Sequence, residues 1–275
     1  MKTETNIIKA LDKQSDNEKS SYLPKSSFIM TISASRGSGK STLIINILTN
    51  KNLLAGKFQQ IYLISPTSCL DTKFELLKKT NIKAACVMPY LSSSKKISRI
   101  MSNPNFIKID DRNKTLKMTD RDFISLPSIS FLENLIESQK TQISAYGKDK
   151  ADNVLLIYDD CILDPIFKSK AFIGLVFNSR HFKISIIISS QCYFSIPKPI
   201  RLNSSVVLVF FTANKKELTN IYEENNAGLS NRAFLTLFNK ITQPDWQFIV
   251  FNYANKKKDR IQNCFNDFIK YDNLK

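Results

Sequence analysis

A glycine-rich stretch near the start of the chain constrains its fold more than any other feature. Residues 33–42 read Ser-Ala-Ser-Arg-Gly-Ser-Gly-Lys-Ser-Thr and lie between two apolar runs, residues 28–32 and 43–48. A strand, a glycine-rich loop and a helix in this order are the context that a phosphate-binding P-loop requires. The motif therefore predicts a strand over 28–33, a helix over 40–49 and a bound nucleotide phosphate between them.

The residues of this loop have separate tasks in a P-loop. Gly37 and Gly39 let backbone N–H groups turn inward around a phosphate, and Lys40 reaches the terminal phosphates. The hydroxyl of Ser41 holds Mg²⁺. Ala34 stands where the usual pattern has its first glycine, and a chance turn before a helix is the alternative interpretation. The nucleotide-binding residues expected on this basis are Ser35, Arg36, Gly37, Ser38, Gly39, Lys40, Ser41 and Thr42.

Two adjacent carboxylates follow a second apolar run, about 120 residues further on. Residues Val154–Tyr158 are all apolar, and Asp159 and Asp160 follow them directly. A continuous apolar run of this length is typical of a strand buried on both faces of a parallel sheet. Ligands of open α/β sheets bind at the carboxyl ends of the strands. We expect Asp159 to bind Mg²⁺ and Asp160 to orient or deprotonate an attacking water. A turn or a helix cap is the alternative for such a pair.

The charge balance of the chain points to a polyanionic partner. Forty Lys and Arg residues against 24 Asp and Glu residues give a net charge of +16 and an isoelectric point near 9.6. Nucleic acid is the first candidate partner and an acidic membrane surface the second, while a solvated basic surface without a partner is the alternative. No stretch approaches the ~20 apolar residues of a membrane span, and the first residues lack secretory signal character, so a soluble intracellular protein is expected.

The five cysteines do not form a recognisable framework. Their number is odd, they are widely spaced and no C-x-x-C occurs, so neither a disulfide scaffold nor a zinc site is indicated. We expect most of them to be reduced thiols in the core. They are Cys69, Cys86, Cys161, Cys192 and Cys264.

Apolar runs alternate with helix-like segments from Phe28 onward, which is the pattern of a largely parallel sheet. We predict one α/β domain over residues 26–255, preceded by a flexible tail over 1–25 and followed by a basic segment over 256–275. Residues 91–121 break the alternation and are predicted to be a basic surface insertion, either a solvated loop or a surface that follows phosphates. Strands are expected at Phe28–Ser33, Ile61–Ser65, Ala84–Met88, Val154–Tyr158, Ile184–Ser190, Val206–Phe211 and Gln247–Tyr253, and helices at Lys40–Thr49, Thr72–Thr80, Ile129–Thr141, Pro165–Phe177, Lys215–Glu224 and Asn231–Ile241.

A glutamine ends the strand that follows the aspartate pair in the sequence. If this strand lies beside the Asp159 strand in a parallel sheet, the amide of Gln191 emerges near the terminal phosphate and can orient water or sense phosphate loss. An ordinary polar residue at a strand end is the alternative. Arg180 closes the preceding helix, where the helix dipole alone favours a cation.

Three further residues have weaker functional signals. Arg201 lies in a proline-rich stretch predicted to be a turn, where a structural or intersubunit salt bridge is as good an interpretation as a nucleotide contact. His181 is the only histidine and is expected to pack or to make a local hydrogen bond. Trp246 is expected in the core rather than as a platform on which bases stack.

This constellation resembles the FtsK–HerA superfamily of ring-forming DNA motors, and most closely the genome-packaging ATPases of poxviruses and other large or virophage-like DNA viruses. The resemblance covers about residues 28–211, and it rests on the order and spacing of several motifs rather than on any one of them. The matching stretches are Ala34-Ser-Arg-Gly-Ser-Gly-Lys-Ser41, Leu155-Leu-Ile-Tyr-Asp-Asp160, Arg180-His181, Ile187-Ile-Ser-Ser-Gln191-Cys-Tyr-Phe-Ser-Ile-Pro197 and Ile200-Arg-Leu-Asn203.

The resemblance implies a RecA-like P-loop NTPase fold and a homo-oligomeric ring, a pentamer or hexamer. Such a ring hydrolyses ATP with Mg²⁺, moves double-stranded DNA of any sequence into a preformed capsid and contacts that capsid, in the host cytoplasm. Arg180, eleven residues before Gln191, matches the arginine finger that reaches the γ-phosphate of a neighbouring subunit, and Gln191 matches the polar sensor. Many members carry Glu where this chain has Asp160, which places the catalytic base of this chain in question.

Two other function classes stay open on the sequence alone. A phosphotransferase similar to nucleotide kinases uses the same P-loop, although it has no need of a +16 charge. A non-motor assembly protein switched by ATP is the third candidate. ATP hydrolysis that rises with DNA and yields no phosphorylated acceptor distinguishes the motor from both.

Overall fold

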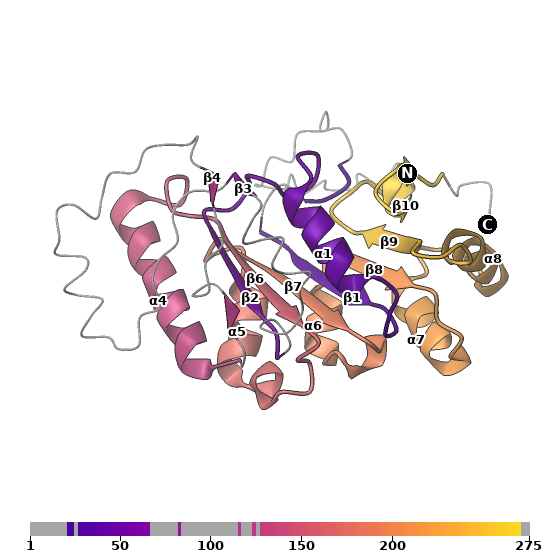
Figure 1. Ribbon diagram of the computed structural model, residues 1–275, viewed down its shortest axis with the longest axis horizontal. Coiled ribbons are helices and arrows are strands. Elements are labelled where there is room, and N and C mark those ends of the chain that lie inside the picture. The colour runs from indigo at the N-terminus through magenta and orange to yellow at the C-terminus, as the bar shows by residue number, and fades with distance from the viewer. Residues whose placement is uncertain are drawn as a thin grey trace, which may run out of the picture.

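A single twisted sheet forms the centre of the protein (Figure 1). The computed structural model describes residues 21–24, 27–66, 82–83, 115–116, 123–124 and 127–270. Within these residues the sheet has nine strands, of which six neighbouring strands are parallel and the three at one edge are antiparallel. In spatial order the strands are β11 (Asp267–Phe268), β10 (Ile261–Asn263), β9 (Phe248–Asn252), β8 (Val206–Phe210), β1 (Ile29–Ser33), β7 (Ile184–Ser190), β6 (Val154–Asp159), β2 (Gln60–Ile64) and β5 (Phe123–Ile124).

Helices cover both faces of the sheet, which explains why its central strands are apolar along their whole length. Every residue of β6 and β7 is buried. Along β6, Leu155 and Ile157 pack in the core under α1, while Leu156 and Tyr158 pack in the core on the other face. One face carries α1 (Lys40–Thr49), and the other carries α4 (Ile129–Tyr146), α5 (Lys170–Asn178), α6 (Lys198–Asn203), α7 (Lys215–Asn225) and α8 (Asn231–Thr242).

The helix α1 is fixed against the sheet by one apolar face. Ile44 and Ile47 are fully buried and Leu48 nearly so, in the same core as Met30 and Ile32 of β1. Burying one such side chain contributes about 1.5–3 kcal/mol, so this face holds the start of the helix firmly beside the end of β1. The loop between them is therefore anchored on both sides.

Most of the predicted elements are confirmed, and the bounds of α1 and β7 agree with the sequence prediction. The single helix predicted over Pro165–Phe177 is wrong, because a 3-10 helix at Pro165–Lys168 precedes α5. Ser169 separates the two with an extended backbone, and its side chain accepts a hydrogen bond from the N–H of Phe172 at the start of α5.

Other differences involve short elements. Residues 198–203 form the helix α6 rather than a turn, because the fixed φ of Pro199 suits the first turn of a helix. The basic segment over 256–275 contributes β10 and β11 to the same sheet. The predicted strand at 84–88, the helix at 72–80 and nearly all of the insertion over 91–121 lie outside the described residues. Two short described strands, β3 (Ile82–Lys83) and β4 (Thr115–Leu116), pair in a second small sheet. Within the described part of the chain, no helix has the length and apolar character needed to cross a bilayer.

Candidate active site

The P-loop lies at the carboxyl end of β1, as the sequence predicts. Gly37 and Gly39 have φ values of 82° and 93°, a left-handed backbone that would strain any side-chain-bearing residue. Lys40 is only 7% exposed and donates a hydrogen bond from Nζ to the carbonyl of Ala34, at 3.0 Å. Ser41 is half-buried in the first turn of α1. The lysine side chain thus folds back across its own loop and directs its ammonium group to the place where phosphates bind in such loops.

The aspartate pair lies at the same edge of the sheet, at the end of β6. Asp159 is 2% exposed and accepts a hydrogen bond from the hydroxyl of Ser189 on the neighbouring strand β7. Asp160 has a left-handed backbone with φ of 52°, and its Oδ1 lies 3.4 Å from Nζ of Lys40. Two segments about 120 residues apart in the sequence therefore meet at one ion pair.

Ser189 is a residue of this site that sequence reasoning missed. Its hydroxyl donates to Asp159, while the N–H of Asp160 approaches its Oγ and its carbonyl at 3.4 and 3.3 Å. The same residue therefore fixes the side chain of one aspartate and the backbone of the other. The signal was available, since two serines interrupt an otherwise apolar strand just before Gln191.

Gln191 follows β7 directly and is exposed at the carboxyl edge. Ser33 pairs with Ser190 across β1 and β7, and the N–H of Ala34 donates to the carbonyl of Ser190 at 3.0 Å. The glutamine consequently begins next to the first residue of the P-loop, on the side of β1 that faces the aspartates. The strands β6 and β7 are parallel neighbours, which is the arrangement that the prediction for Gln191 assumed.

Glu217 is a second residue that sequence reasoning missed. This glutamate of α7 is buried, and its carboxylate accepts hydrogen bonds from the N–H of Tyr193 at 2.6 Å and from the hydroxyls of Ser33 and Thr212 at 3.3 and 3.2 Å. It ties the end of β1, the segment after Gln191 and the segment after β8 to one another. Nothing in the sequence marks it, because its partners lie in three separate segments.

Arg180 lies at the opposite edge of the sheet. It is exposed in the turn between α5 and β7, before the amino end of that strand. The seven residues of β7 at 3.3 Å each separate the two edges by about 20 Å. The arginine is therefore too far from the P-loop of its own chain to contact a phosphate there. His181, beside it, is exposed rather than packed.

Arg201 is a structural residue. Its side chain is 5% exposed and makes two hydrogen bonds to Glu224, from Nε at 2.9 Å and from a terminal nitrogen at 2.8 Å. The hydroxyl of Tyr193 donates to the same carboxylate at 2.9 Å, and the ring of Phe194 lies 4.5 Å from the guanidinium carbon. The hydrogen bonds from Arg201 lower the pKa of Glu224 below its ordinary value. Of the two interpretations that the sequence allowed, the structural salt bridge is the one present.

The expectation that Trp246 belongs to the core is wrong. The side chain is 66% exposed in the turn between α8 and β9, and its backbone is left-handed with φ of 66°. The turn brings the indole beside the P-loop, so that a Cβ placed on Gly39 would lie 3.2 Å from Cε3 of Trp246. The apolar run after the tryptophan predicts the strand β9 correctly, but it does not predict which way the preceding turn directs its side chain.

The three described cysteines are free thiols. Cys161 and Cys264 are buried and Cys192 is half-buried, while Cys69 and Cys86 lie outside the described residues. Burial raises the pKa of Cys161 to about 12, and the neighbouring carboxylates of Asp159 and Asp164 act in the same direction, so that this thiol stays protonated and unreactive.

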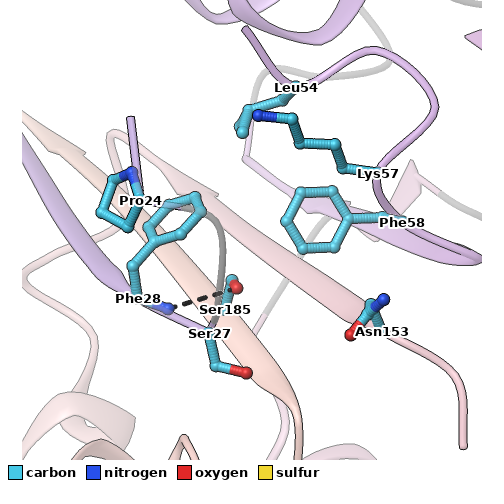
Figure 2. A pocket seen from close by; sticks show the side chains of 8 residues that line it. All are labelled: Pro24, Ser27, Phe28, Leu54, Lys57, Phe58, Asn153 and Ser185. Carbon is cyan, nitrogen blue, oxygen red and sulfur yellow. Dashed lines mark hydrogen bonds between the residues drawn. The ribbon is translucent and has the colours of Figure 1, made fainter. Parts of the chain in front are cut away.

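A small pocket of the protein lies away from this site. Figure 2 shows Phe28, Phe58, Asn153 and Ser185 around it, and Phe28, Asn153 and Ser185 lie at the amino ends of β1, β6 and β7. The pocket is therefore at the edge of the sheet opposite to the P-loop, and it does not belong to the candidate site.

The residues at the P-loop edge fit a magnesium ion better than a transition metal. Ser41 and Asp159 supply a hydroxyl and a carboxylate, the oxygen donors that Mg²⁺ prefers when phosphates complete its shell. Among the described residues, no group of three or more His, Cys, Asp and Glu side chains is arranged to hold a metal ion. A site with two protein ligands relies on the phosphates of a bound nucleotide for the rest.

Comparison with solved structures shows that the chain has the fold of a P-loop NTPase. The structure of the genome packaging NTPase B204 from Sulfolobus turreted icosahedral virus 2 in complex with AMP matches with a TM-score of 0.52 and 16% identity, over 88% of this chain and 98% of that chain. The same protein in complex with ATP-gammaS matches with a TM-score of 0.50 and 18% identity, over 83% and 93% of the two chains. The fold predicted from the sequence is thereby confirmed.

The sequence pattern of the family described as Poxvirus A32 protein matches residues 123–265, more than half of the chain, and the chain belongs to this family. The matched range contains Asp159, Asp160, Arg180 and Gln191. The uncharacterized protein 075L of Invertebrate iridescent virus 6 is 42% identical over 69 residues, which are 25% of this chain and 27% of that protein. The chain thus aligns with only about a quarter of the length of this relative. The resemblance to viral proteins of the poxvirus type is confirmed.

Proposed function

We propose that this protein is the ATP-hydrolysing subunit of a motor that packages double-stranded DNA into a viral capsid. The observation that carries the proposal is the ion pair of Lys40 with Asp160 at the carboxyl edge of the parallel sheet, where Asp159 ends the strand β6. Membership of the Poxvirus A32 family and a fold shared with a genome packaging NTPase support it. ATP with Mg²⁺ is the substrate that this arrangement suits.

The P-loop binds the phosphates in this proposal. Backbone N–H groups of the turn at Gly37 and Gly39 surround them, and the ammonium of Lys40 neutralises the terminal phosphates. Lys40 must exchange its contacts with Ala34 and Asp160 for a phosphate, which frees the carboxylate of Asp160 when nucleotide enters. Binding of the nucleotide thus prepares the residue that acts on water.

Ser41 and Asp159 are the residues that hold Mg²⁺ in this proposal. When bound there, the ion would neutralise charge on the phosphates while the γ-phosphoryl group is transferred to water. Ser189 keeps the carboxylate of Asp159 in one orientation through its hydroxyl. A fixed carboxylate requires no reorganisation when the ion arrives, which favours binding.

Asp160 and Gln191 act on the attacking water. The water oxygen bonds to the γ-phosphorus while the bond to the bridging β-γ oxygen breaks, and Asp160 accepts a proton from the water. The amide of Gln191 orients this water from the neighbouring strand. The products are ADP and inorganic phosphate, with no covalent intermediate on the protein.

Arg180 acts in a neighbouring subunit rather than in its own. It is exposed about 20 Å from the P-loop edge, so only a second copy arranged in a ring brings such an arginine to a γ-phosphate. Arginine fingers of this kind contribute about 10³–10⁵ in turnover. Hydrolysis then depends on assembly of the ring, a pentamer or a hexamer.

The DNA track is a basic surface without base-reading contacts. A charge of +16 suits phosphate contacts that hold any sequence equally, as a motor requires. The insertion over 91–121 lies almost wholly outside the described residues and is the first candidate for this track. The exposed lysines 256–258, between β9 and β10, are the second.

The test is ATP hydrolysis with and without double-stranded DNA of several unrelated sequences, together with a search for phosphorylated acceptors. The proposal predicts hydrolysis that rises with every DNA and a binding constant whose logarithm falls by about 0.9 per phosphate contact per decade of salt. A phosphorylated acceptor would identify a phosphotransferase instead. Hydrolysis that does not respond to any DNA would favour an assembly protein switched by ATP.

A further inference from the structure

The only tryptophan of the chain occupies an unusual position for so large an apolar side chain. Trp246 is two-thirds exposed, although tryptophans generally bury most of their rings. Its backbone is left-handed with φ of 66°, a conformation that bulky residues rarely adopt. Strain of this kind persists where the surrounding structure holds it, and it clusters at ligand sites.

The turn that carries the tryptophan is well defined. It joins α8 to β9, and the N–H of Gln247 donates to the carbonyl of Pro244 at 3.3 Å. The side chain of Gln247 in turn accepts a hydrogen bond from the thiol of Cys264, at 2.8 Å. The turn therefore presents Trp246 from a fixed backbone rather than from an open loop.

The indole lies against the P-loop. A Cβ on Gly39 would lie 3.2 Å from Cε3 and 3.8 Å from Cζ3 of Trp246, so part of the ring borders the residue at which α1 begins. The rest of the ring is open to solvent. An exposed aromatic ring beside a phosphate-binding loop is a surface on which a planar group can stack.

The order of the strands shows which part of a nucleotide could reach this ring. β1 lies between β7 and β8, and β9 follows β8. Asp160 and Gln191 stand on the β7 and β6 side of the P-loop, so the terminal phosphate faces that side in the proposed reaction. Trp246 stands on the opposite side, at the start of β9. A nucleotide whose terminal phosphate faces Asp160 would therefore direct its nucleoside end toward Trp246.

We propose that Trp246 stacks on the base of the nucleotide whose phosphates occupy the P-loop. The inference rests on the proposed nucleotide site and adds the residue that binds the base. Stacking tolerates every base, because each base has a π-face. The ligand class is therefore a nucleoside triphosphate of relaxed base identity, with the affinity supplied by the ring rather than by hydrogen bonds to base edges.

The experiment compares ATP with inorganic tripolyphosphate, which has the phosphates without the base. Calorimetric titrations of the full chain are made with wild type, Trp246→Ala and Trp246→Phe. Trp246→Ala should weaken ATP binding by about 5- to 150-fold and leave tripolyphosphate binding unchanged. Trp246→Phe, which keeps an aromatic face, should recover most of the loss. The affinity for GTP should change among these variants in the same way as the affinity for ATP. Phe177→Ala, which removes an aromatic ring that is 60% exposed at the end of α5, is the matched control and should change neither affinity.

Fluorescence of the wild type gives an independent readout, because the chain has one tryptophan. ATP should change its emission clearly more than tripolyphosphate does. Trp246→Ala that binds ATP as tightly as wild type overturns the inference and leaves the nucleotide site intact. Equal loss of ATP and tripolyphosphate binding also overturns it, since the ring would then only shape the loop. A wild type that binds neither ligand overturns the proposed function as well.

Discussion

Lys40 and Asp160 form an ion pair across the carboxyl edge of the sheet, with Nζ and Oδ1 at 3.4 Å. The lysine begins α1 and the aspartate follows β6, so the pair joins the two halves of the candidate site. Lys40 is 7% exposed, and its other contact is the carbonyl of Ala34. A phosphate that enters the loop competes with both groups for the same ammonium.

Replacing this lysine should remove most of the nucleotide affinity. Lys40→Ala deletes the ammonium that the terminal phosphates require, and we expect ATP binding at least about tenfold weaker by calorimetry. Lys51→Ala, an exposed lysine just after α1, is the matched control and should bind ATP normally. Equal affinity of Lys40→Ala and wild type for ATP would show that the P-loop does not bind the nucleotide.

Ser189 should set the magnesium requirement without touching the nucleotide. Ser189→Ala removes the hydroxyl that donates to Asp159 and that lies beside the N–H of Asp160, so both residues lose their support. We expect the Mg²⁺ concentration for half-maximal hydrolysis to rise by about 10- to 100-fold. Ser185→Ala is the control, because Ser185 lies on the same strand β7 but at the edge of the sheet opposite to the P-loop. The same shift in both variants would mean that the serine only maintains the strand.

The buried pair of Arg201 and Glu224 should stabilise the fold rather than catalysis. Arg201→Met leaves the carboxylate of Glu224 without its main partner, and we expect the free energy of unfolding to fall by about 3–5 kcal/mol in urea titrations. The double variant with Glu224→Leu should recover much of this loss. Lys140→Ala, which breaks an exposed pair with Glu137, should cost about 0.5 kcal/mol or less. An unfolding free energy of Arg201→Met equal to that of wild type would contradict the structural role.

The pair of Arg201 and Glu224 should make the free energy of unfolding depend on pH in a predictable direction. The pKa of Glu224 lies below its ordinary value of 4.5, chiefly because Arg201 donates hydrogen bonds to the carboxylate. The stability from this pair is therefore present above pH 4.5 and is lost as the pH falls through the lowered pKa. The difference in unfolding free energy between wild type and Arg201→Met should narrow in that range, and a difference that widens on acidification would contradict the assignment.

Arg180 should act between subunits. Arg180→Ala should bind ATP and lose hydrolysis, because the arginine stabilises charge in the transition state and lies far from the P-loop of its own chain. Mixing it with Lys40→Ala should restore part of the activity, since some interfaces then pair an intact P-loop with an intact arginine. Arg232→Ala, an exposed arginine of α8, is the control. No recovery at any ratio, in rings that exchange subunits, would argue for a role within one chain.

The part of the site that was predictable from the sequence is the part that local chemistry fixes. A P-loop needs glycines at its tight turns and a lysine at the helix start, so Gly37, Gly39 and Lys40 are recognisable without a structure. The aspartates and Gln191 follow long apolar runs, and parallel strands end at a common edge. Strand order alone then brings them together.

The remaining features depend on distant partners or on single turns. Glu217 and Ser189 function through hydrogen bonds to other segments, and the Arg201 partner lies 23 residues away on another helix. Trp246 was misplaced because the left-handed backbone of one residue decides the direction of its side chain. Likewise, the extended backbone of the single residue Ser169 divides the helix that was predicted over Pro165–Phe177.

Turnover of Asp160→Asn at saturating MgATP measures whether the carboxyl edge of the sheet hydrolyses ATP. We expect this variant to bind MgATP with an affinity close to that of wild type and to hydrolyse it about 10²–10⁴-fold more slowly, because the group that accepts the proton of water is neutralised. Asp159→Asn, measured beside it, should instead need more Mg²⁺. Hydrolysis by Asp160→Asn at the wild-type rate would contradict the claim that this edge of the sheet is the hydrolytic centre.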